Sequence, residues 1–326
     1  MTSYRPAGYT ILGYGRMVAD RVRTDAYAEA LRRAVRPGCT VLDIGTGPGI
    51  FALLACQAGA GHVYAVDPNP SIRLAQELAL ANGFADRITF LQDLSTNVTL
   101  PQRADVIVQD LHGLLPLFQR YIPTLMDARE RHLAPGGVLI PRRETLWLAP
   151  VEAPQVYRQY AGPWDESPYG LDWGPAREVG LNAIGKAQVQ PEQLVAPPQP
   201  WATLDYLTIA SPDVVGDVQF AVQRPAVVHG LAAWFDAELV DGVGFSAAPG
   251  RPETIYGHTF FPWRQPTAVE PGDLIVATVQ ATLGGHDYLW TWSVRVLDQR
   301  RRVKTCYEHS TFFADHGNYE LTGGSS

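Results

Sequence analysis

Two carboxylates and three glycines near the start of the chain could together hold a nucleoside. Asp43 lies in a short apolar run, and Gly45, Gly47 and Gly49 follow it at alternate positions. Glycine is needed where a ligand approaches the backbone, because a Cβ atom would block that approach. Asp67 ends a second apolar run, where a carboxylate can accept hydrogen bonds from both hydroxyls of a ribose. The pattern predicts a site for an adenosine-type ligand.

The spacing of the glycines separates two kinds of nucleotide site. NAD-binding domains use G-x-G-x-x-G, with a helix N-terminus facing a pyrophosphate. This chain has D-x-G-x-G-x-G between Asp43 and Gly49, with Thr46 inside the turn. That form resembles motif I of the class I S-adenosylmethionine (SAM) methyltransferases, which bind no pyrophosphate. We therefore expect a SAM-type site; the alternative is a structural strand-to-helix turn without a ligand.

The elements that would position these residues alternate between helix and strand as far as about Pro150. The expected strands are 40–44, 62–66, 87–91, 104–108 and 136–140, and the expected helices are 23–35, 49–60, 71–82 and 118–133. The 104–108 run is apolar enough to be buried on both faces, as strands of parallel sheets are. We predict the α/β class, with a Rossmann-like sheet that binds its ligand at the carboxyl ends of the first strands.

After about residue 150 the helical periodicity fades, and short aromatic or β-branched runs alternate with Pro and Gly. Examples of these expected strands are 203–209, 217–223, 230–239, 273–283 and 288–297. Such runs indicate an antiparallel β domain, a barrel or a sandwich. The segment 157–193 has a mixed helical character that fits neither pattern. We expect two domains, residues 1–145 and residues 146–326, with this segment as an insertion in the second.

The composition excludes several function classes. Hydrophobic residues make up 46% of the chain and charged residues 18%, and the net charge is −7. A negative balance argues against non-specific nucleic-acid binding. Residues 1–4 open no signal peptide, and no apolar run approaches the ~20 residues of a membrane span. The three cysteines have no metal spacing and no disulfide framework. We expect a cytoplasmic protein with no metal and with neither a nucleic-acid nor a membrane partner.

A SAM-type sheet followed by a β domain with an insertion resembles the protein arginine methyltransferases, and the resemblance runs from about Tyr14 to Trp263. Residues 17–24 are similar to the family's first helix, whose arginine holds the SAM carboxylate; Arg23 matches it. A guanidinium grips a carboxylate with two parallel hydrogen bonds. Tyr14 matches a residue that closes over the cofactor.

The resemblance extends into the second half of the chain. Residues 133–141 resemble the strand that leads out of the SAM domain, and residues 234–236 and 243–246 resemble barrel strands. Residues 169–172 resemble the start of the family's dimerisation arm, which implies a homodimer. After the third strand, Asp93 and Thr96 are candidates for contacting the adenine amine; the alternative for Asp93 is a turn acid.

The acceptor site departs from the family's pattern. Where two glutamates of a hairpin loop hold the acceptor guanidinium, this chain has Asp110 and Gln119. His112 offers a second base with a pKa near neutrality, or a structural histidine. The family's barrel histidine is replaced by Pro262, beside Trp263, which matches a residue lining the acceptor pocket.

Losing one of two carboxylates around a buried cation forfeits on the order of several kcal/mol, which disfavours peptidyl arginine as acceptor. The resemblance then implies methyl transfer from SAM to a nitrogen of a small molecule or side chain, leaving S-adenosylhomocysteine. Asp110 would orient or deprotonate the acceptor, and Gln119 would hydrogen-bond it. The alternatives are an O- or C-methyltransferase of a small metabolite and a noncatalytic SAM-binding or scaffolding protein.

Overall fold

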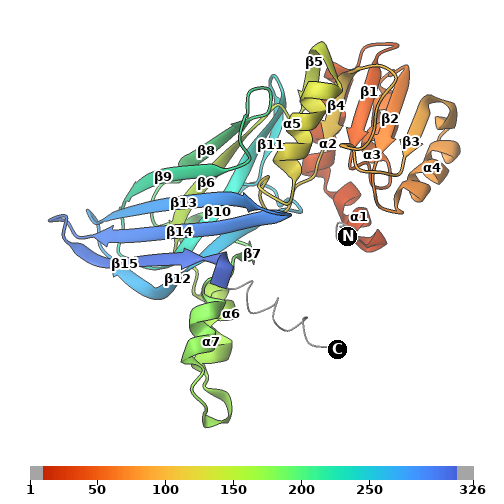
Figure 1. Ribbon diagram of the computed structural model, residues 1–326. Coiled ribbons are helices and arrows are strands. Elements are labelled where there is room, and N and C mark those ends of the chain that lie inside the picture. Colours follow the sequence, from red (N-terminus) through yellow and green to blue (C-terminus); the bar gives the residue numbers. More distant parts are fainter. Residues whose placement is uncertain (1–9, 314–326) are drawn as a thin grey trace.

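The computed structural model describes residues 10–313, and its elements form a parallel sheet with helices followed by two antiparallel sheets (Figure 1). The expectation that no signal peptide begins the chain concerns residues 1–4, which lie outside the described residues. None of the helices within residues 10–313 has the length and hydrophobicity that a membrane crossing would require.

The first sheet has five parallel strands in the order β3-β2-β1-β4-β5. The chain adds β2 and β3 on one side of β1 and then β4 and β5 on the other. The connection therefore reverses direction between β1 and β4, which is where ligands bind in open α/β sheets. The strands are β1 (Thr40–Ile44), β2 (His62–Val66), β3 (Ile88–Leu91), β4 (Ala104–Gln109) and β5 (Leu133–Ile140).

Five α-helices accompany this sheet, and their apolar residues join its core. Helix α3 packs against β1 and β2, α4 against β3, and α5 against β5. The expected helix 118–133 starts later than predicted because Gln119 has a positive φ of 44°, which a helix cannot include. The helices are α1 (Ile11–Ala19), α2 (Arg21–Ala34), α3 (Ile50–Gln57), α4 (Ile72–Ala81) and α5 (Tyr121–Arg131), with a 3₁₀ turn η1 (Ala85–Arg87) before β3.

The second part contains two antiparallel sheets that share one core, here called the barrel. One sheet has the order β7-β12-β10-β6-β8, with β11 paired to β10, and the other has the order β15-β14-β13-β9. Phe261 of β12 packs against Trp290 and Trp292 of β14, which joins the two sheets. The strands are β6 (Arg143–Val151), β7 (Gly185–Ala187), β8 (Gln199–Asp205), β9 (Val214–Ala221), β10 (Ala226–Val240), β11 (Val243–Ser246), β12 (His258–Val269), β13 (Leu274–Gly284), β14 (Asp287–Leu297) and β15 (Val303–Ser310).

The fold confirms the expected class, a Rossmann-like sheet followed by antiparallel β structure. Strands β6, β7, β12 and β15 were not among the runs recognised by periodicity. Strand β12 contains Pro262 and Pro266, and proline lowers the expectation of a strand because it removes a ladder donor. The strand accommodates its prolines where the register between β10 and β12 shifts, next to the pairing of Gly230 with Pro262.

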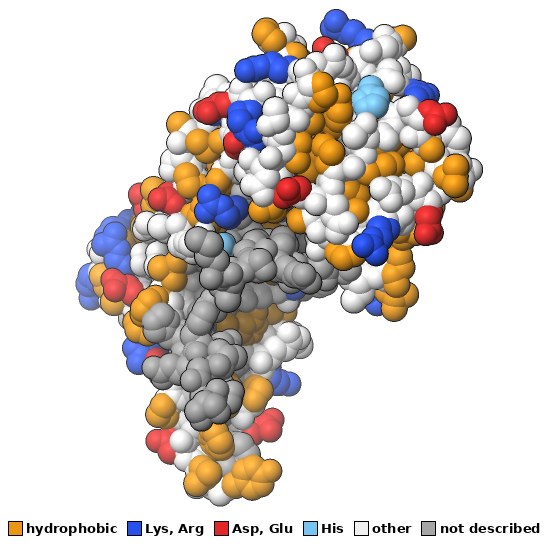
Figure 2. All heavy atoms as spheres, turned by 45° about the vertical axis from the view of Figure 1, so that its right-hand side comes forward, with side chains coloured by type: hydrophobic (Ala, Val, Ile, Leu, Met, Phe, Trp, Pro, Cys, Tyr) orange, Lys and Arg blue, Asp and Glu red, His pale blue; other side chains and the backbone are white. Residues whose placement is uncertain are grey.

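The 157–193 insertion includes a helical arm that projects from the barrel (Figure 1). It contains α6 (Pro154–Asp165), the 3₁₀ turn η2 (Pro168–Gly170) and α7 (Gly174–Gly180), and a further 3₁₀ turn, η3 (Pro191–Gln193), lies beyond β7. The base of the arm is anchored, because Tyr157 and Leu181 are buried. Its tip, at the bottom of Figure 2, carries hydrophobic side chains: Tyr169 is 95% exposed and Leu171 56%.

Candidate active site

The glycine turn after β1 lies at the switch point of the parallel sheet. Gly45 and Gly47 have φ angles of 73° and 52°, which other residues adopt only at a cost. A Cβ atom at Gly45 would collide with Leu111, and one at Gly47 would lie 2.8 Å from the ring of Tyr14. The turn therefore needs glycine both for its conformation and for the side chains that cover it.

Asp43 and Thr46 brace this turn from the sheet side. Asp43 Oδ2 accepts hydrogen bonds from Thr46 Oγ1 at 2.6 Å and from the backbone N–H of Ala52 at 3.0 Å. Its Oδ1 has no hydrogen-bond partner within residues 10–313. Burial raises the pKa of Asp43 to about 7. The pair thus ties β1, the turn and α3 together and leaves one buried acceptor unpartnered.

Asp67 stands at the end of β2 beside the same turn. Its Oδ2 accepts the backbone N–H of Gly47 at 2.8 Å, and its Oδ1 accepts that of Asn69 at 2.7 Å. Burial raises the pKa of Asp67. Each carboxylate oxygen has two lone pairs, so each retains one for a ligand. Such a carboxylate can accept hydrogen bonds from two vicinal hydroxyls.

Tyr14 lies on the other face of the turn, on helix α1. Its ring covers Gly47, and its hydroxyl lies 3.1 Å from Ser71 Oγ. Burial raises the pKa of its phenol. This placement suits a residue that covers a bound molecule, although here the ring rests on the glycine turn itself.

The second half of the site is a buried ion cluster, defined here as Arg23, Asp110, His112 and Glu144. Arg23 Nε donates to Asp110 Oδ2, and His112 Nδ1 lies 2.5 Å from Asp110 Oδ1. His112 Nε2 lies 3.1 Å from Glu144 Oε2. The four side chains come from α2, the loop after β4 and β6, and none is more than 5% exposed. Two basic and two acidic side chains therefore lie in contact inside the protein.

Two tyrosine hydroxyls complete the cluster. Tyr256, from the loop before β12, donates to Asp110, with its oxygen 2.7 and 2.8 Å from the two carboxylate oxygens. Tyr206 donates to Glu144 Oε2. The Arg23 guanidinium also lies over the rings of Tyr27 and Phe51, at 5.5 and 5.1 Å from their centroids. The cluster is thus held by both the parallel-sheet part and the barrel.

The charges of the cluster set its protonation states. Burial would lower the pKa of His112, but Glu144 and Asp110 outweigh it and raise that pKa to about 10. Burial would raise the pKa of Asp110, but Arg23 and His112 outweigh it and hold that pKa well below its usual value. A pKa raised in this way favours the protonated ring at neutral pH, in contrast to the near-neutral pKa expected of a second base. A protonated ring donates hydrogen bonds where a base would accept them.

Gln119 is placed away from this cluster. Its backbone N–H donates to Asp287 Oδ1 at 2.9 Å, at the start of β14, and within residues 10–313 it makes no hydrogen bond to the ion cluster. Arg120 beside it donates to the carbonyl of Gly285. The loop after β4 therefore turns its first half toward the cluster and its second half toward the β13–β14 hairpin.

Three further predicted residues make no hydrogen bond to the glycine turn or to the ion cluster within residues 10–313. Trp263 is fully buried in the barrel core, 6.0 Å from the ring of Tyr307. Its side chain is not exposed to solvent in this structure. Asp93 is an exposed turn acid whose Oδ1 accepts from the backbone N–H of Leu94 and from Asn97. Thr96 is exposed in the same turn.

Sequence reasoning did not identify Glu144, Tyr206 or Tyr256. Glu144 lies between Arg143 and Thr145 at the start of a strand, where a polar residue usually indicates a solvated face. Its only signal was position, since it directly follows the segment leading out of the parallel sheet. Tyr256 precedes a strand that the prolines concealed.

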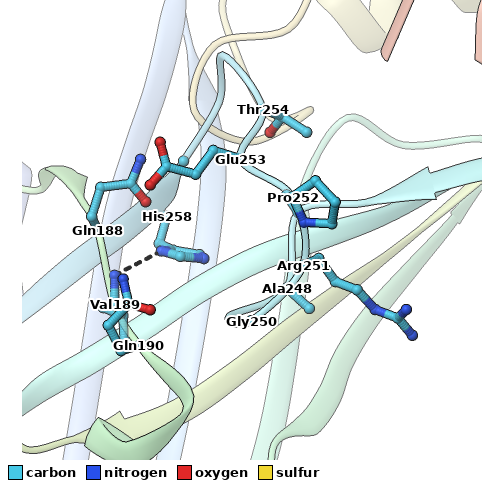
Figure 3. Close-up of a pocket in the computed structure, with 12 residues that line it drawn as sticks. Gln188, Val189, Gln190, Ala248, Gly250, Arg251, Pro252, Glu253, Thr254 and His258 are labelled. Carbon is cyan, nitrogen blue, oxygen red and sulfur yellow. Dashed lines mark hydrogen bonds between the residues drawn. The ribbon is translucent and has the colours of Figure 1, made fainter. Parts of the chain in front are cut away.

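A cavity of about 210 Å³ lies beside the loop that carries Tyr256 (Figure 3). It is lined by residues 188–190 and by parts of 247–258, and His258 Nδ1 accepts the backbone N–H of Val189 within it. Burial lowers the pKa of His258. None of the residues predicted from the sequence lines this cavity, so it is separate from the candidate site.

The donor set fits SAM. Arg23 is a buried cation whose Nη2 has no hydrogen-bond partner within residues 10–313, and it would hold the SAM carboxylate. Asp67 retains acceptors for the ribose hydroxyls, and the unpartnered Asp43 Oδ1 lies beside a turn that only glycine can form. A cation for the amino-acid end and a carboxylate for the ribose thus flank the glycine turn.

Comparisons with known families divide the chain at the same place as the sheets. Residues 23–141 match the family described as ribosomal protein L11 methyltransferase (PrmA). Residues 142–288 match the arginine methyltransferase oligomerization subdomain. The family border thus lies just ahead of β6, the first strand of the barrel.

Named relatives extend along most of the chain. Protein arginine N-methyltransferase 1 of Dictyostelium discoideum is 30% identical over 271 residues, which cover 81% of this chain and 79% of the relative. Protein arginine N-methyltransferase 1 of Schizosaccharomyces pombe is 30% identical over 276 residues, with the same two shares covered.

Solved structures share the fold. A Trypanosoma brucei PRMT1 enzyme–prozyme heterotetrameric complex with AdoHcy has a TM-score of 0.83 at 22% identity, covering 91% of this chain and 96% of that one. Arabidopsis thaliana protein arginine methyltransferase 10, in an open conformation, has a TM-score of 0.81 at 23% identity, covering 93% and 98%.

Proposed function

Because this chain belongs to the protein arginine methyltransferase family of SAM-dependent methyltransferases, we propose that it transfers the methyl group of SAM to a nitrogen atom of its acceptor. SAM, when bound, supplies an electrophilic methyl group. The observation that carries the proposal is that the glycine turn, Arg23 and Asp110 all gather where the sheet reverses between β1 and β4.

Family membership favours an enzyme over a noncatalytic binding protein. Asp67 would accept hydrogen bonds from the ribose, and Arg23 would bind the carboxylate of the cofactor. Tyr14, already over the turn, would exclude water from it. Transfer of a methyl group between two positioned groups gains chiefly from proximity and orientation, which is what these fixed side chains supply.

Asp110 is the group that we propose orients the acceptor nitrogen. Its low pKa keeps it a carboxylate at neutral pH, and three donors fix its plane. Protein arginine is the first acceptor to test, because the relatives are named for it. A single carboxylate can hold one edge of a guanidinium.

A nitrogen acceptor other than peptidyl arginine, on a small molecule or another side chain, is the second candidate. The observation that favours it is the charge balance of the ion cluster: Asp110 is already compensated by Arg23 and His112. Gln119 adds no charge and lies toward the β13–β14 hairpin. A less basic, uncharged nitrogen could bind beside Asp110 without adding a third cation to Arg23 and His112.

A direct assay decides between the two acceptors. The full chain is incubated with methyl-labelled SAM and, separately, with an arginine-rich peptide, free arginine and a fractionated extract of small molecules. Labelled methylarginine in the peptide supports the first candidate, and label confined to the small-molecule fraction supports the second. Label in neither, with SAM binding intact, would contradict the proposal of an active methyltransferase. Label on an oxygen or carbon atom would contradict nitrogen transfer.

The cofactor assignment predicts a specific loss of affinity. Replacing Asp67 with alanine should weaken SAM binding by about 1.5–3 kcal/mol, because the ribose loses a charged acceptor and Gly47 loses its hydrogen bond. Isothermal titration calorimetry measures the change. Asp86→Ala, which removes an exposed acid in η1, should leave the affinity unchanged; equal affinity in both variants would remove Asp67 from the site.

We also propose that the chain forms a homodimer through its arm, which lies in the segment that matches the oligomerization subdomain. The exposed tip supports this, because apolar side chains at 95% and 56% exposure indicate a contact surface. The double variant Tyr169→Asp/Leu171→Asp should be monomeric in light scattering at micromolar concentration, with unchanged circular dichroism. A monomeric unsubstituted chain would contradict the proposal.

A further inference from the structure

We propose that Glu144 is a positioning residue of the acceptor site, which acts through His112 to fix the carboxylate of Asp110. The inference rests on the proposed function, because it assigns to Asp110 the orientation of the acceptor. It goes beyond that function by giving a role to Glu144, a strand residue in the barrel that contacts neither the glycine turn nor Asp110 directly.

A carboxylate lies against each ring nitrogen of His112. His112 Nδ1 faces Asp110 at 2.5 Å, and Nε2 faces Glu144 at 3.0 and 3.1 Å. Ionised carboxylates only accept hydrogen bonds, so with both acids ionised both ring nitrogens donate and the ring is an imidazolium, in line with the raised pKa of His112. The side chains of His112 and Glu144 are both 0% exposed, and water does not replace either partner. Tyr206 adds a second donor to Glu144.

Glu144 therefore decides whether Asp110 has a charged neighbour on its Oδ1 side. With Glu144 in place, Asp110 is held by a cation on each side, Arg23 and His112. If Arg23 turns toward a cofactor carboxylate, His112 still fixes the plane of Asp110. Without Glu144, the buried ring loses one of its two anionic partners and the cost of burying its charge is no longer balanced.

Within residues 10–313, the rings that pack against His112 do not offer a substitute anion. The ring of Tyr121 from α5 lies 5.0 Å away, that of Tyr256 lies 5.6 Å away, and that of Phe235 from β10 lies 5.3 Å away. The tyrosines stay neutral, since burial raises both of their pKa values. The protonation of His112 thus depends on Asp110 and Glu144.

The first test needs no activity. The full chain is labelled in its histidines, and the ring of His112 is assigned from the signal lost in His112→Gln. In the unsubstituted protein, NMR should find both ring nitrogens protonated at pH 8, and Glu144→Gln should move the titration midpoint down by at least one pH unit. A midpoint near ~6.5 in the unsubstituted protein, or no shift in the variant, would overturn the proposal.

The second test measures turnover with the acceptor that the labelling assay identifies. Glu144→Gln should lower kcat at least tenfold with little change in SAM affinity. The alkaline limb of its pH–rate profile should also lie at a lower pH than that of the unsubstituted protein. Glu144→Asp, which keeps the charge, should recover most of the rate. The control is Glu152→Gln, the same substitution at the residue after β6, where Glu152 forms an ion pair with Arg224. This variant should have the kcat and the pH–rate profile of the unsubstituted protein.

The two tests separate this inference from the proposed function. If no acceptor is methylated but the NMR midpoint behaves as expected, the function is contradicted and the link between Glu144 and Asp110 stands. If methylation proceeds and Glu144→Gln, with native circular dichroism, keeps both its rate and its pH profile, the positioning role is wrong. A Glu144→Gln chain that does not fold leaves the titration of the unsubstituted protein as the deciding result.

Discussion

Replacing Asp110 with asparagine is expected to lower kcat by roughly a hundredfold or more, the size of effect seen when one preorganised polar group is removed from an active site. The substitution removes the proposed acceptor ligand and leaves Arg23 and His112 facing a neutral amide. Since breaking a buried ion pair costs about 3–5 kcal/mol, the free energy of unfolding should also fall. Timed methylation assays measure the change in kcat, and urea titrations measure the change in the free energy of unfolding.

The same substitution at an aspartate within β4 itself provides the control. Asp105→Asn lies near the amino end of that strand, where Oδ2 accepts the backbone N–H of Thr40 at 2.8 Å. It should keep its kcat, because it is at the opposite end of the strand from Asp110. If Asp110→Asn is folded and turns over at the unsubstituted rate, Asp110 does not orient the acceptor.

The stability of the protein should fall as the pH rises from 7 to 8.5. The pKa of His112 is about 10 in the folded protein and ~6.5 in an unfolded chain. Its contribution is therefore complete below the unfolded pKa and is lost progressively as the pH rises through the folded one. At about 1.4 kcal/mol per pH unit, this interval should cost about 2 kcal/mol, measurable by urea denaturation at each pH.

Two histidine variants test whether His112 causes this fall in stability with pH. His112→Gln should flatten the slope, whereas His62→Gln, which removes a half-buried ring bonded to Thr89, should retain it. Other groups add a slope of the same sign to the unsubstituted protein and to both variants. Burial raises the pKa of Asp43 to about 7, which acts near the lower end of this interval, and raises the pKa values of Cys39 and Cys56, which act near the upper end. An equal slope in His112→Gln would show that His112 is not protonated in the folded state.

Local patterns predicted the parallel sheet and its glycine turn well. Gly45, Gly47 and Asp67 are close in sequence, and their roles follow from strand and turn chemistry that a short window contains. The strand ends of the barrel were less accurate, and β12 was missed. Its alternation is broken by Pro262 and Pro266, and only the register shift against β10 explains how they fit.

The ion cluster could not be read from the sequence because its members are distant and their roles are mutual. Resemblance gave Arg23 to the cofactor and Asp110 to the acceptor, yet the fold joins them directly across 87 positions. The neutral base expected at His112 became a cation because Glu144, on another strand, lies against its second nitrogen. Partners of this kind appear only when the topology brings two sheets together.

Because the members of the ion cluster are far apart in the sequence, the cluster can be completed only late in the synthesis of the chain. Domains generally fold as units, the N-terminal one first, while the rest of the chain is still being made. Arg23, Asp110 and His112 belong to the first unit, but Glu144 arrives with β6 and Tyr256 with the loop before β12. A nascent parallel sheet would hold an unfinished cluster until that loop docks, so the proposed acceptor site cannot mature before most of the barrel has been made.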